Sequence, residues 1–345
     1  MNVLFLIIGS FQGIDQHEIY PDLARKFCRE GHRLYVVCSN ERRTNKETEL
    51  IDQGNIKILK VKIGNITKCS AIEKGISTVL INYQFRHAIK RYFADVRFDL
   101  IIYATPPITL YETVRYVKNR DAAKTYLMLK DIFPQNAIDI GILSTHGLRG
   151  IISKYFKHKE EQLYLVSDYI GCMSDANCAY LMANYSKLDK RKLEVCPNCF
   201  EVRSYILSET QKRSIKDKYK IPDDKIVLVY GGNLGKPQGI PFLLECLRTQ
   251  KFNQSVFFLI IGEGTEFEYI EDEIKREKYS NVKLYPRVPS EDFDKVMEVC
   301  NCGLVFLDHR FSIPNYPSRI LPYMQASLPI LACTDTATDL RDLII

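Results

Sequence analysis

Apolar runs of strand length alternate with amphipathic segments of helical length along the whole chain, and this alternation restricts the fold more than any other feature. It predicts an α/β fold in which helices cover both faces of parallel sheets. The strand candidates are residues 3–8, 33–38, 56–62, 99–103, 124–129, 168–172, 193–196, 226–230, 256–261, 282–285, 302–307 and 329–333. The helix candidates include residues 17–30, 71–93, 148–166, 175–184, 239–249, 265–278, 290–299 and 317–326.

The pattern restarts after its weakest stretch, residues 197–224, which contains Pro197 and Pro222. The chain has 345 residues, enough for two domains of about 150 residues each. We therefore predict two doubly wound Rossmann-like domains, residues 1–205 and 206–345, facing across a cleft at the carboxyl ends of their strands. The second domain stops soon after its fifth strand, at TDLRDLII, so we expect it to be truncated.

Charge and apolar content exclude several classes of protein. A formal net charge of +6 is too weak a basic bias for a nucleic-acid binder, but it suits anionic small molecules or an anionic membrane surface. The N-terminal MNVLFLIIGSFQG lacks the basic region and cleavage site of a signal peptide. No window reaches the roughly 18 apolar residues that a membrane span needs.

Cysteine usage points to a reducing compartment. The eleven cysteines are odd in number and lie mostly in apolar stretches. Without an export signal they indicate reduced thiols in a cytosolic protein. Cys196 and Cys199 form a CPNC, but no second CxxC or His pair accompanies it nearby, so no metal site is predicted.

The stretch GGNLGKPQGI, residues 231–240, follows an apolar strand candidate and opens a helix candidate. Its glycines permit positive φ and a close approach of the backbone to a ligand, and a helix N-terminus attracts anions. Lys236 adds a positive charge, so the loop suits a diphosphate. It is not a Walker loop, because Pro237 follows the lysine, and the dinucleotide motif GxGxxG is absent. On local grounds alone a plain strand-to-helix turn explains the stretch equally well.

The motifs that follow this loop resemble those of a known family. They are FFLIIGEGTEFEYI, LYPRVPSEDF and PSRILPYMQASLPILACTD, and in this order they resemble the nucleotide-sugar-binding domain of family 4 glycosyltransferases, which have the GT-B fold. EGHRLYVVCSNER, FDLIIYATPPIT, LKDIFPQNAIDIG and SDYIGCMSDAN in the first half are similar to the branch that builds O-antigen and capsule polysaccharides, including fucosamine transferases. The resemblance covers nearly the whole chain.

This resemblance implies a reaction. The chain would transfer a sugar from a nucleotide diphosphate donor, with UDP favoured, to a lipid-linked saccharide, with retention of configuration. It would need no metal or cofactor besides the nucleotide sugar and would work in the cytoplasm, on the inner face of the membrane. Two alternatives remain: a truncated or degenerate nucleotide-sugar-binding subunit without turnover, and a nucleotide-sugar epimerase with the same architecture.

The resemblance also assigns the residues of a donor site. They are Gly232, Asn233, Lys236, Gln238, Gly262, Gly264, Arg287, Val288, Asn315, Pro317, Ser318 and Arg319. Many relatives carry Arg and Lys where this chain has Asn233 and Gln238, so Lys236 and Arg319 are the candidates for pairing with the diphosphate. For Gly262 and Gly264 a tight strand-to-helix turn is an equal alternative.

One departure from the family concerns the donor sugar. Many members place two glutamates eight positions apart, where this chain has Pro314 and Pro322. The contacts to the donor sugar are therefore unassigned, and Asn315 and Tyr316 are the candidates to replace the missing carboxylates. Pro317 and Ser318 are also ordinary residues for the start of a helix.

The acceptor side is assigned to the first half. Asp131 follows a strand candidate at its carboxyl end and is the catalytic candidate, able to accept a hydrogen bond from a sugar hydroxyl or to act on the acceptor. A helix cap or a partner for Lys130 is the structural alternative. The loop after the first strand supplies the other candidates, which are Gly9, Ser10, Gln12, Gly13 and Gln16.

A membrane contact is the last prediction. Residues 146–166, HGLRGIISKYFKHKEEQLYLV, combine basic side chains with an aliphatic and aromatic face. Such a helix can lie on an anionic bilayer. A domain helix with a solvated outer face is the alternative.

Overall fold

The computed structural model describes the backbone of residues 1–345 and every side chain except that of Ala71. The chain divides into two compact units, unit 1 (Met1–Asn198) and unit 2 (Cys199–Ile345). The division comes directly after Pro197 and Asn198, a few residues before the boundary that the sequence analysis placed after residue 205.

Unit 1 contains one eight-stranded sheet with the order β3-β4-β2-β1-β5-β6-β7-β8, parallel except where β3 meets β4. The strands are β1 (Asn2–Leu6), β2 (Arg33–Glu41), β3 (Glu49–Asp52), β4 (Ile56–Ile63), β5 (Leu100–Ala104), β6 (Lys124–Leu129), β7 (Tyr169–Cys172) and β8 (Leu193–Val195). The helices are α1 (Ile19–Arg29), α2 (Ala71–Tyr92), α3 (Tyr111–Asp121), α4 (Gln135–Asp139), α5 (Gly147–Val166) and α6 (Asp175–Asn184). The strand candidates of this half are confirmed, with small differences at their ends.

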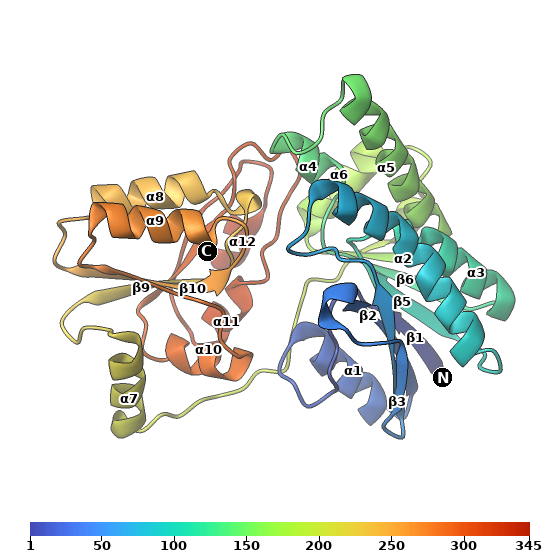
Figure 1. Ribbon diagram of the computed structural model, residues 1–345, viewed down its shortest axis with the longest axis horizontal. Helices are drawn as coiled ribbons and strands as arrows, with labels where there is room; N and C mark the ends of the chain where they lie inside the picture. The colour runs from blue at the N-terminus through green and yellow to red at the C-terminus, as the bar shows by residue number, and fades with distance from the viewer. The chain divides into compact units, whose positions relative to one another are not determined.

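Helices cover both faces of this sheet, with α1 on one face and α2, α3 and α5 on the other (Figure 1). Because successive side chains of a strand point to opposite faces, both faces of a central strand must be apolar. In β1 the side chains of Val3 and Phe5 pack in the core that includes Ala24 of α1, and Leu4 and Leu6 are fully buried as well. This is why the central strands read as continuous apolar runs rather than alternating ones.

Strand β3 was not predicted. It is an antiparallel edge strand that follows the short helical turn Arg42–Thr44 and reaches β4 through a turn at Gly54, whose φ is +77°. Its four residues include no buried side chain, so the sequence carries no alternation there that would indicate a strand.

Unit 2 contains a five-stranded parallel sheet with the order β11-β10-β9-β12-β13. The strands are β9 (Ile226–Asn233), β10 (Val256–Glu263), β11 (Val282–Tyr285), β12 (Cys302–Phe306) and β13 (Ile330–Cys333). The helices are α7 (Glu209–Tyr219), α8 (Ile240–Thr249), α9 (Phe267–Glu277), α10 (Ser290–Met297), α11 (Ile320–Gln325) and α12 (Leu340–Ile344). Both sheets have the doubly wound order, so the prediction of two Rossmann-like domains is confirmed.

Two hydrophobic cores flank the sheet of unit 2. One joins α8 and α9 to the face that carries Tyr230 and Ile260, and the other joins α10 and α11 to the face that carries Val229 and Leu259. Figure 1 shows α8 and α9 on one side of β9 and β10, and α10 and α11 on the other. Helix α7 lies in the stretch that the sequence analysis found weakly periodic. Its capping box, formed by Ser208 and Gln211, is the local signal that could have located it.

The strands β9 and β12 diverge soon after they meet. They pair only at Leu228 with Cys302 and at Val229 with Gly303, whereas β9 pairs with β10 along its whole length. The buried side chain of Tyr323, from α11, bridges the divergence. Its hydroxyl accepts the Gly231 N–H at 3.0 Å and lies 3.2 Å from the carbonyl oxygens of Val229 and Leu304, to which it can donate.

We expect Tyr323→Phe to lower the free energy of unfolding by about 1–3 kcal/mol, because the Gly231 N–H would be left buried without a partner. Urea denaturation measures this. The matched control is Tyr269→Phe, which removes an exposed tyrosine hydroxyl from α9 and should change little. Equal stability of the two variants would contradict the bridging role.

Candidate functional site

Topology places the best candidate ligand site of unit 2 at the carboxyl ends of β9 and β12. The strand order reverses between these two strands, and doubly wound sheets bind ligands where the order reverses, beyond the carboxyl ends of their strands. The predicted diphosphate loop leaves β9 at this point. It continues through a helical turn, Lys236–Gln238, into α8.

Two glycines of this loop need a left-handed backbone. Gly232 has a φ of +110° and Gly239 a φ of +56°. A side chain at Gly239 would also place its Cβ 3.0 Å from the Leu307 carbonyl oxygen. Helix α8 then begins at Ile240 without a side-chain cap. Pro241 has no N–H, and the Phe242 and Leu243 N–H groups donate to the Gly239 carbonyl oxygen at 2.9 and 3.2 Å, so this helix start offers an anion few free donors.

Gly262 and Gly264 hold the loop in place by letting backbone approach backbone. A Cβ on Gly262 would lie 2.0 Å from the Gly232 carbonyl oxygen, and one on Gly264 would lie 2.3 Å from the Leu234 carbonyl oxygen. The buried Leu234 also donates its N–H to Glu263 and accepts one from Glu266. This packing explains why both positions are glycine, and ligand contact at either one stays a prediction.

Arg319 lies against the loop with part of its charge unsatisfied. Its guanidinium is 4.3 Å from the centroid of the Tyr230 ring. Nη2 donates to Gln238 Oε1 and, at 3.4 Å, to the Asn233 carbonyl oxygen. Nε and Nη1 are buried and have no hydrogen-bond partner among the described residues. A buried donor without a partner is costly, so an anion bound here would satisfy it.

The other predicted cation, Lys236, is exposed, and no described residue pairs with its ammonium group. Asn233 is exposed too, and its carbonyl oxygen accepts from Arg319 and from the Tyr230 hydroxyl at 2.9 Å. The structure therefore brings Asn233, Lys236, Gln238 and Arg319 to one loop, and their contact with a ligand stays a prediction.

The remaining donor candidates lie around this loop with ordinary structural partners. Arg287 forms an exposed ion pair with Glu263 at 3.2 Å, and Val288 packs on a core of unit 2. The Asn315 carbonyl oxygen accepts from the Thr338 hydroxyl at 2.6 Å. Pro317 and Ser318 form a turn before α11, which begins at Ile320, later than the predicted helix start at residue 317.

Asp308 was missed in the sequence analysis. It follows β12, is buried, and donates its N–H to the Pro237 carbonyl oxygen of the loop at 3.0 Å. The Arg310 guanidinium, 2.6 Å away, holds the pKa of the Asp308 carboxyl below its usual range. A carboxylate directly after an apolar strand was the available signal.

In unit 1 the loop after β1 is fixed by neighbouring strands. The Gly9 N–H donates to Ser39 Oγ of β2 at 2.7 Å, and Lys60 Nζ of β4 donates to Gln12 Oε1 at 3.1 Å. Gln12 also donates to Ser10. Gly9 and Gly13 have φ values of +117° and +148°. The Gln16 carbonyl oxygen accepts from Arg25 of α1. The loop is thus preformed, and its contact with an acceptor stays a prediction.

Asp131 lies just beyond β6, half-buried. Both of its oxygens accept from the Asn136 amide at 2.8 Å, and its N–H donates to Thr105 Oγ1 at 3.4 Å. Burial raises the pKa of the Asp131 carboxyl to about 6, against the opposing effects of the Asn136 amide and the Ile132 N–H. The residue that precedes α4 is Pro134, so Asp131 is not the cap of that helix.

Glu160 is a second perturbed carboxyl, which the sequence analysis did not single out. It comes from α5, is 1% exposed and accepts from the hydroxyls of Tyr164, at 2.7 Å, and Tyr185. Burial raises the pKa of Glu160 to about 7, and the negative charge of Asp131 adds to the increase. The signal in the sequence was a glutamate at a helical spacing where its neighbours Leu163 and Tyr164 are core residues.

Two features are absent from the described residues. No helix combines the length and apolarity needed to cross a bilayer. No group of three His, Cys, Asp or Glu side chains is arranged to hold a metal ion.

Most of unit 2 matches a family model. Residues 211–338 match the family model of glycosyl transferases group 1. The chain is 21% identical over 294 residues to a protein described as the glycosyltransferase WbjE of Pseudomonas aeruginosa, which covers 82% of this chain and 68% of that protein. It is 20% identical over 148 residues to WcaI of Escherichia coli strain K12, described as a colanic acid biosynthesis glycosyl transferase, covering 43% of this chain and 36% of WcaI.

A solved structure shares the fold. The crystal structure of Anabaena HepE in complex with UDP and glucose matches 100% of this chain and 89% of HepE, with a TM-score of 0.67 and 13% identity. The likeness identifies the fold as GT-B.

We expect the free energy of unfolding to fall as the pH rises from about 4.5 through about 7, because the ionised form of Glu160 is disfavoured only in the folded state. A shift from 4.5 to about 7 corresponds to a loss on the order of 3 kcal/mol. Glu160→Gln should remove most of this loss and leave the smaller contribution of Asp131. The measurement is urea denaturation across this pH range.

Glu161→Gln is the matched control, because Glu161 is the next residue and forms an ion pair with Lys187 at 3.2 Å on the surface. It should keep the pH dependence of the unsubstituted chain. If Glu160→Gln keeps that dependence too, the carboxyl titrates normally and the argument for a perturbed site fails.

Proposed function

We propose that this chain, a group 1 glycosyltransferase with the GT-B fold, transfers a sugar from a UDP-linked donor to a lipid-linked saccharide. The observation that carries the proposal is Arg319. Two of its buried guanidinium nitrogens have no partner among the described residues, and they lie beside the glycine loop at the point where the strand order of unit 2 reverses. A donor diphosphate supplies the oxygens that these nitrogens lack.

The loop offers complementary charge for that diphosphate. Lys236 is exposed two residues before Gln238, which accepts a hydrogen bond from Arg319. Arginine binds phosphate oxygens through paired N–H donors, and lysine acts as a point charge. These groups stabilise negative charge on the leaving diphosphate, which is where charge develops during transfer. The proposal includes no metal or other cofactor. HepE, which shares the fold, was solved with UDP and glucose, which favours UDP.

On the acceptor side we assign Asp131 the contact with the reacting saccharide. With a pKa of about 6, its carboxyl is mostly ionised at neutral pH and can accept a hydrogen bond from a sugar hydroxyl. The loop from Gly9 to Gln16 would orient the saccharide. WcaI is described as acting in colanic acid biosynthesis, which favours a surface polysaccharide such as O-antigen or capsule as the product. Retention of configuration and the fucosamine-transferase-like branch follow from the family resemblance.

A lipid-linked acceptor requires access to the membrane, and unit 1 exposes an apolar face for it. In α5 the side chains of Leu148, Ile151, Ile152 and Tyr155 are exposed beside the basic residues of the same helix, and in α2 so are Ile72, Ile76, Val79 and Leu80. Both helices contact the same short turn, Ile108–Leu110. Exposed apolar side chains among lysines and arginines suit an anionic bilayer, on the cytoplasmic side of the membrane.

We expect UDP to stabilise the chain against heat, by about 2.7 kcal/mol at a hundred times its dissociation constant, and more than GDP or ADP at the same concentration.

Lys236→Ala should weaken UDP binding without lowering stability, because Lys236 is exposed. Arg319→Met should weaken it about tenfold or more, since charged hydrogen bonds contribute about 1.5–3 kcal/mol. Calorimetric titration measures both effects.

The control for these variants is Lys275→Met, which removes a surface cation that pairs with Glu271 on α9. It should bind UDP like the unsubstituted chain. The donor assignment is wrong if no nucleotide stabilises the chain, or if Lys236→Ala and Arg319→Met both bind UDP normally.

We expect the chain to sediment with vesicles of phosphatidylcholine and phosphatidylglycerol, and less so as salt shortens the Debye length from about 10 Å at 0.1 M to about 3 Å at 1 M. Replacing Leu148 and Ile151 by Asp should abolish binding. The control Phe252→Asp changes an equally exposed apolar residue of unit 2 and should bind normally. Absence of binding at low salt would refute the membrane contact.

A further inference from the structure

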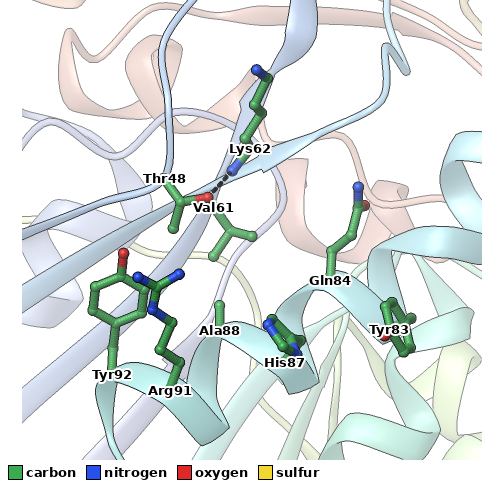
Figure 2. A pocket seen from close by; sticks show the side chains of 9 residues that line it. All are labelled: Thr48, Val61, Lys62, Tyr83, Gln84, His87, Ala88, Arg91 and Tyr92. Carbon is green, nitrogen blue, oxygen red and sulfur yellow. Dashed lines mark hydrogen bonds between the residues drawn. The ribbon is translucent and has the colours of Figure 1, made fainter.

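A pocket of about 170 Å³ lies in unit 1 between β4 and the C-terminal half of α2 (Figure 2). None of its lining residues belongs to the donor or acceptor candidates described above. The pocket exists because β3 is shorter than its neighbour: the pairing of β3 with β4 ends at Glu49 and Lys60, while β4 continues to Ile63. Beyond that point Thr48 Oγ1 accepts the Lys62 N–H at 3.0 Å, and the sheet edge stays open.

The pocket combines an apolar floor with an aromatic wall. Val61 and Ala88 are buried and form the floor. Tyr83 and His87, one helical turn apart on α2, stack with ring centroids 6.2 Å apart and an angle of 17° between their planes. Tyr83 is 60% exposed, so the wall is accessible to a ligand ring from solvent.

A buried acceptor in the pocket has no partner. Gln84 Oε1 is buried and forms no hydrogen bond with the described residues, and Figure 2 shows the Gln84 side chain extending from α2 toward β4. A lone amide oxygen in this position carries a desolvation cost that a hydroxyl of a bound ligand would remove.

The charge of the pocket comes from Arg91. Its guanidinium lies 5.4 Å from the centroid of the Tyr92 ring and forms no ion pair with the described residues. The lining contains no aspartate or glutamate. The ammonium of Lys62 points away from α2 in Figure 2 and pairs with Glu47 at 2.5 Å, so it does not contribute. The arrangement favours a ligand with one carboxylate, which arginine can bind through two parallel hydrogen bonds.

We propose that this pocket is a subsite for an acidic sugar, with the carboxylate on Arg91, a ring hydroxyl donating to Gln84 Oε1 and one face of the sugar ring on Tyr83 and His87. Its volume is below the roughly 300–1,000 Å³ of sites for drug-sized ligands, which suits a single ring. This inference rests on the proposed function, because it makes a uronate-bearing saccharide the acceptor. The site takes a remote sugar of that acceptor and takes no part in the transfer itself.

The test is saturation-transfer NMR on the full chain, without donor, with glucuronate, glucose and glucose 6-phosphate as probes. We expect saturation transfer to glucuronate. The dissociation constant of glucose should be at least about tenfold larger, because glucose cannot form the charged hydrogen bonds. Glucose 6-phosphate should also bind more weakly than glucuronate. No transfer to glucuronate, or binding of glucose 6-phosphate as tight as that of glucuronate, would overturn the subsite for an acidic sugar.

Two variants and one control separate binding from folding. Arg91→Met should weaken the binding of glucuronate at least about tenfold. Gln84→Leu should weaken the binding of glucuronate as well. Its midpoint of thermal unfolding should stay the same or rise, because the substitution removes a buried oxygen that has no partner. Lys74→Met, an exposed cation two turns or more from the pocket on the same helix, should leave binding unchanged.

Normal glucuronate binding by Arg91→Met or Gln84→Leu would overturn the proposal, and so would a lower thermal midpoint in Gln84→Leu, which would show a structural role. These outcomes are independent of the donor assignment. Glucuronate is measured without nucleotide, whereas stabilisation by UDP reports on unit 2, so failure of the subsite and failure of the proposed function give different results.

Discussion

The divergence of β9 from β12 is the constraint on which the candidate donor site depends. Two parallel strands that separate leave backbone N–H and C=O groups without their ladder partners, and a buried group of this kind must find another partner. The Tyr323 hydroxyl supplies one for Gly231 and lies within reach of two carbonyl oxygens. Since Tyr323 comes from α11, the same helix brings Arg319 over Tyr230. The same helix therefore positions both Tyr323, which binds the divergent backbone, and Arg319, the residue directly before the helix, which has nitrogens without a partner.

The glycines around this point allow two backbone segments to pack closely against each other. Gly262 and Gly264 allow β10 and its loop to lie against Gly232 and Leu234, where any side chain would collide with a carbonyl oxygen. Beside this loop, Nε and Nη1 of Arg319 have no hydrogen-bond partner among the described residues. Because the Arg319 guanidinium is already desolvated in the folded protein, binding of an anion does not have to supply that desolvation cost again. If the proposed donor site is right, this chain would rely more on Arg319, the residue directly before α11, than on cations of the loop itself.

Unit 1 buries some polar groups in its interior and exposes some apolar side chains on its surface. The charge of Asp131 adds to the raised pKa of Glu160 inside the unit. Tyrosine hydroxyls donate to Glu160, and the Asn136 amide donates to Asp131. On the surface, α2 and α5 expose aliphatic side chains, and the proposed membrane contact rests on them. Farther along α2 the exposed side chains become aromatic and cationic, at Tyr83 and Arg91. A lipid-linked saccharide with an acidic sugar would use both parts of this helix.

The sequence by itself determined the two Rossmann-like domains, because strand-length apolar runs in regular alternation with helices can be buried only as parallel sheets covered on both faces. It also indicated a family resemblance, through the order of the motifs around residues 231–240 and 317–333. It did not determine β3, which buries nothing, or the coupling of Glu160 to Asp131, which are distant in the chain. Only the tertiary structure decided which side chain meets which backbone group: the bridge from Tyr323 to Gly231, the unpartnered nitrogens of Arg319 and the open edge beside Gln84. The physical reason is that hydrophobic periodicity is a local property of the chain, whereas desolvation and hydrogen-bond satisfaction depend on residues that only folding brings together.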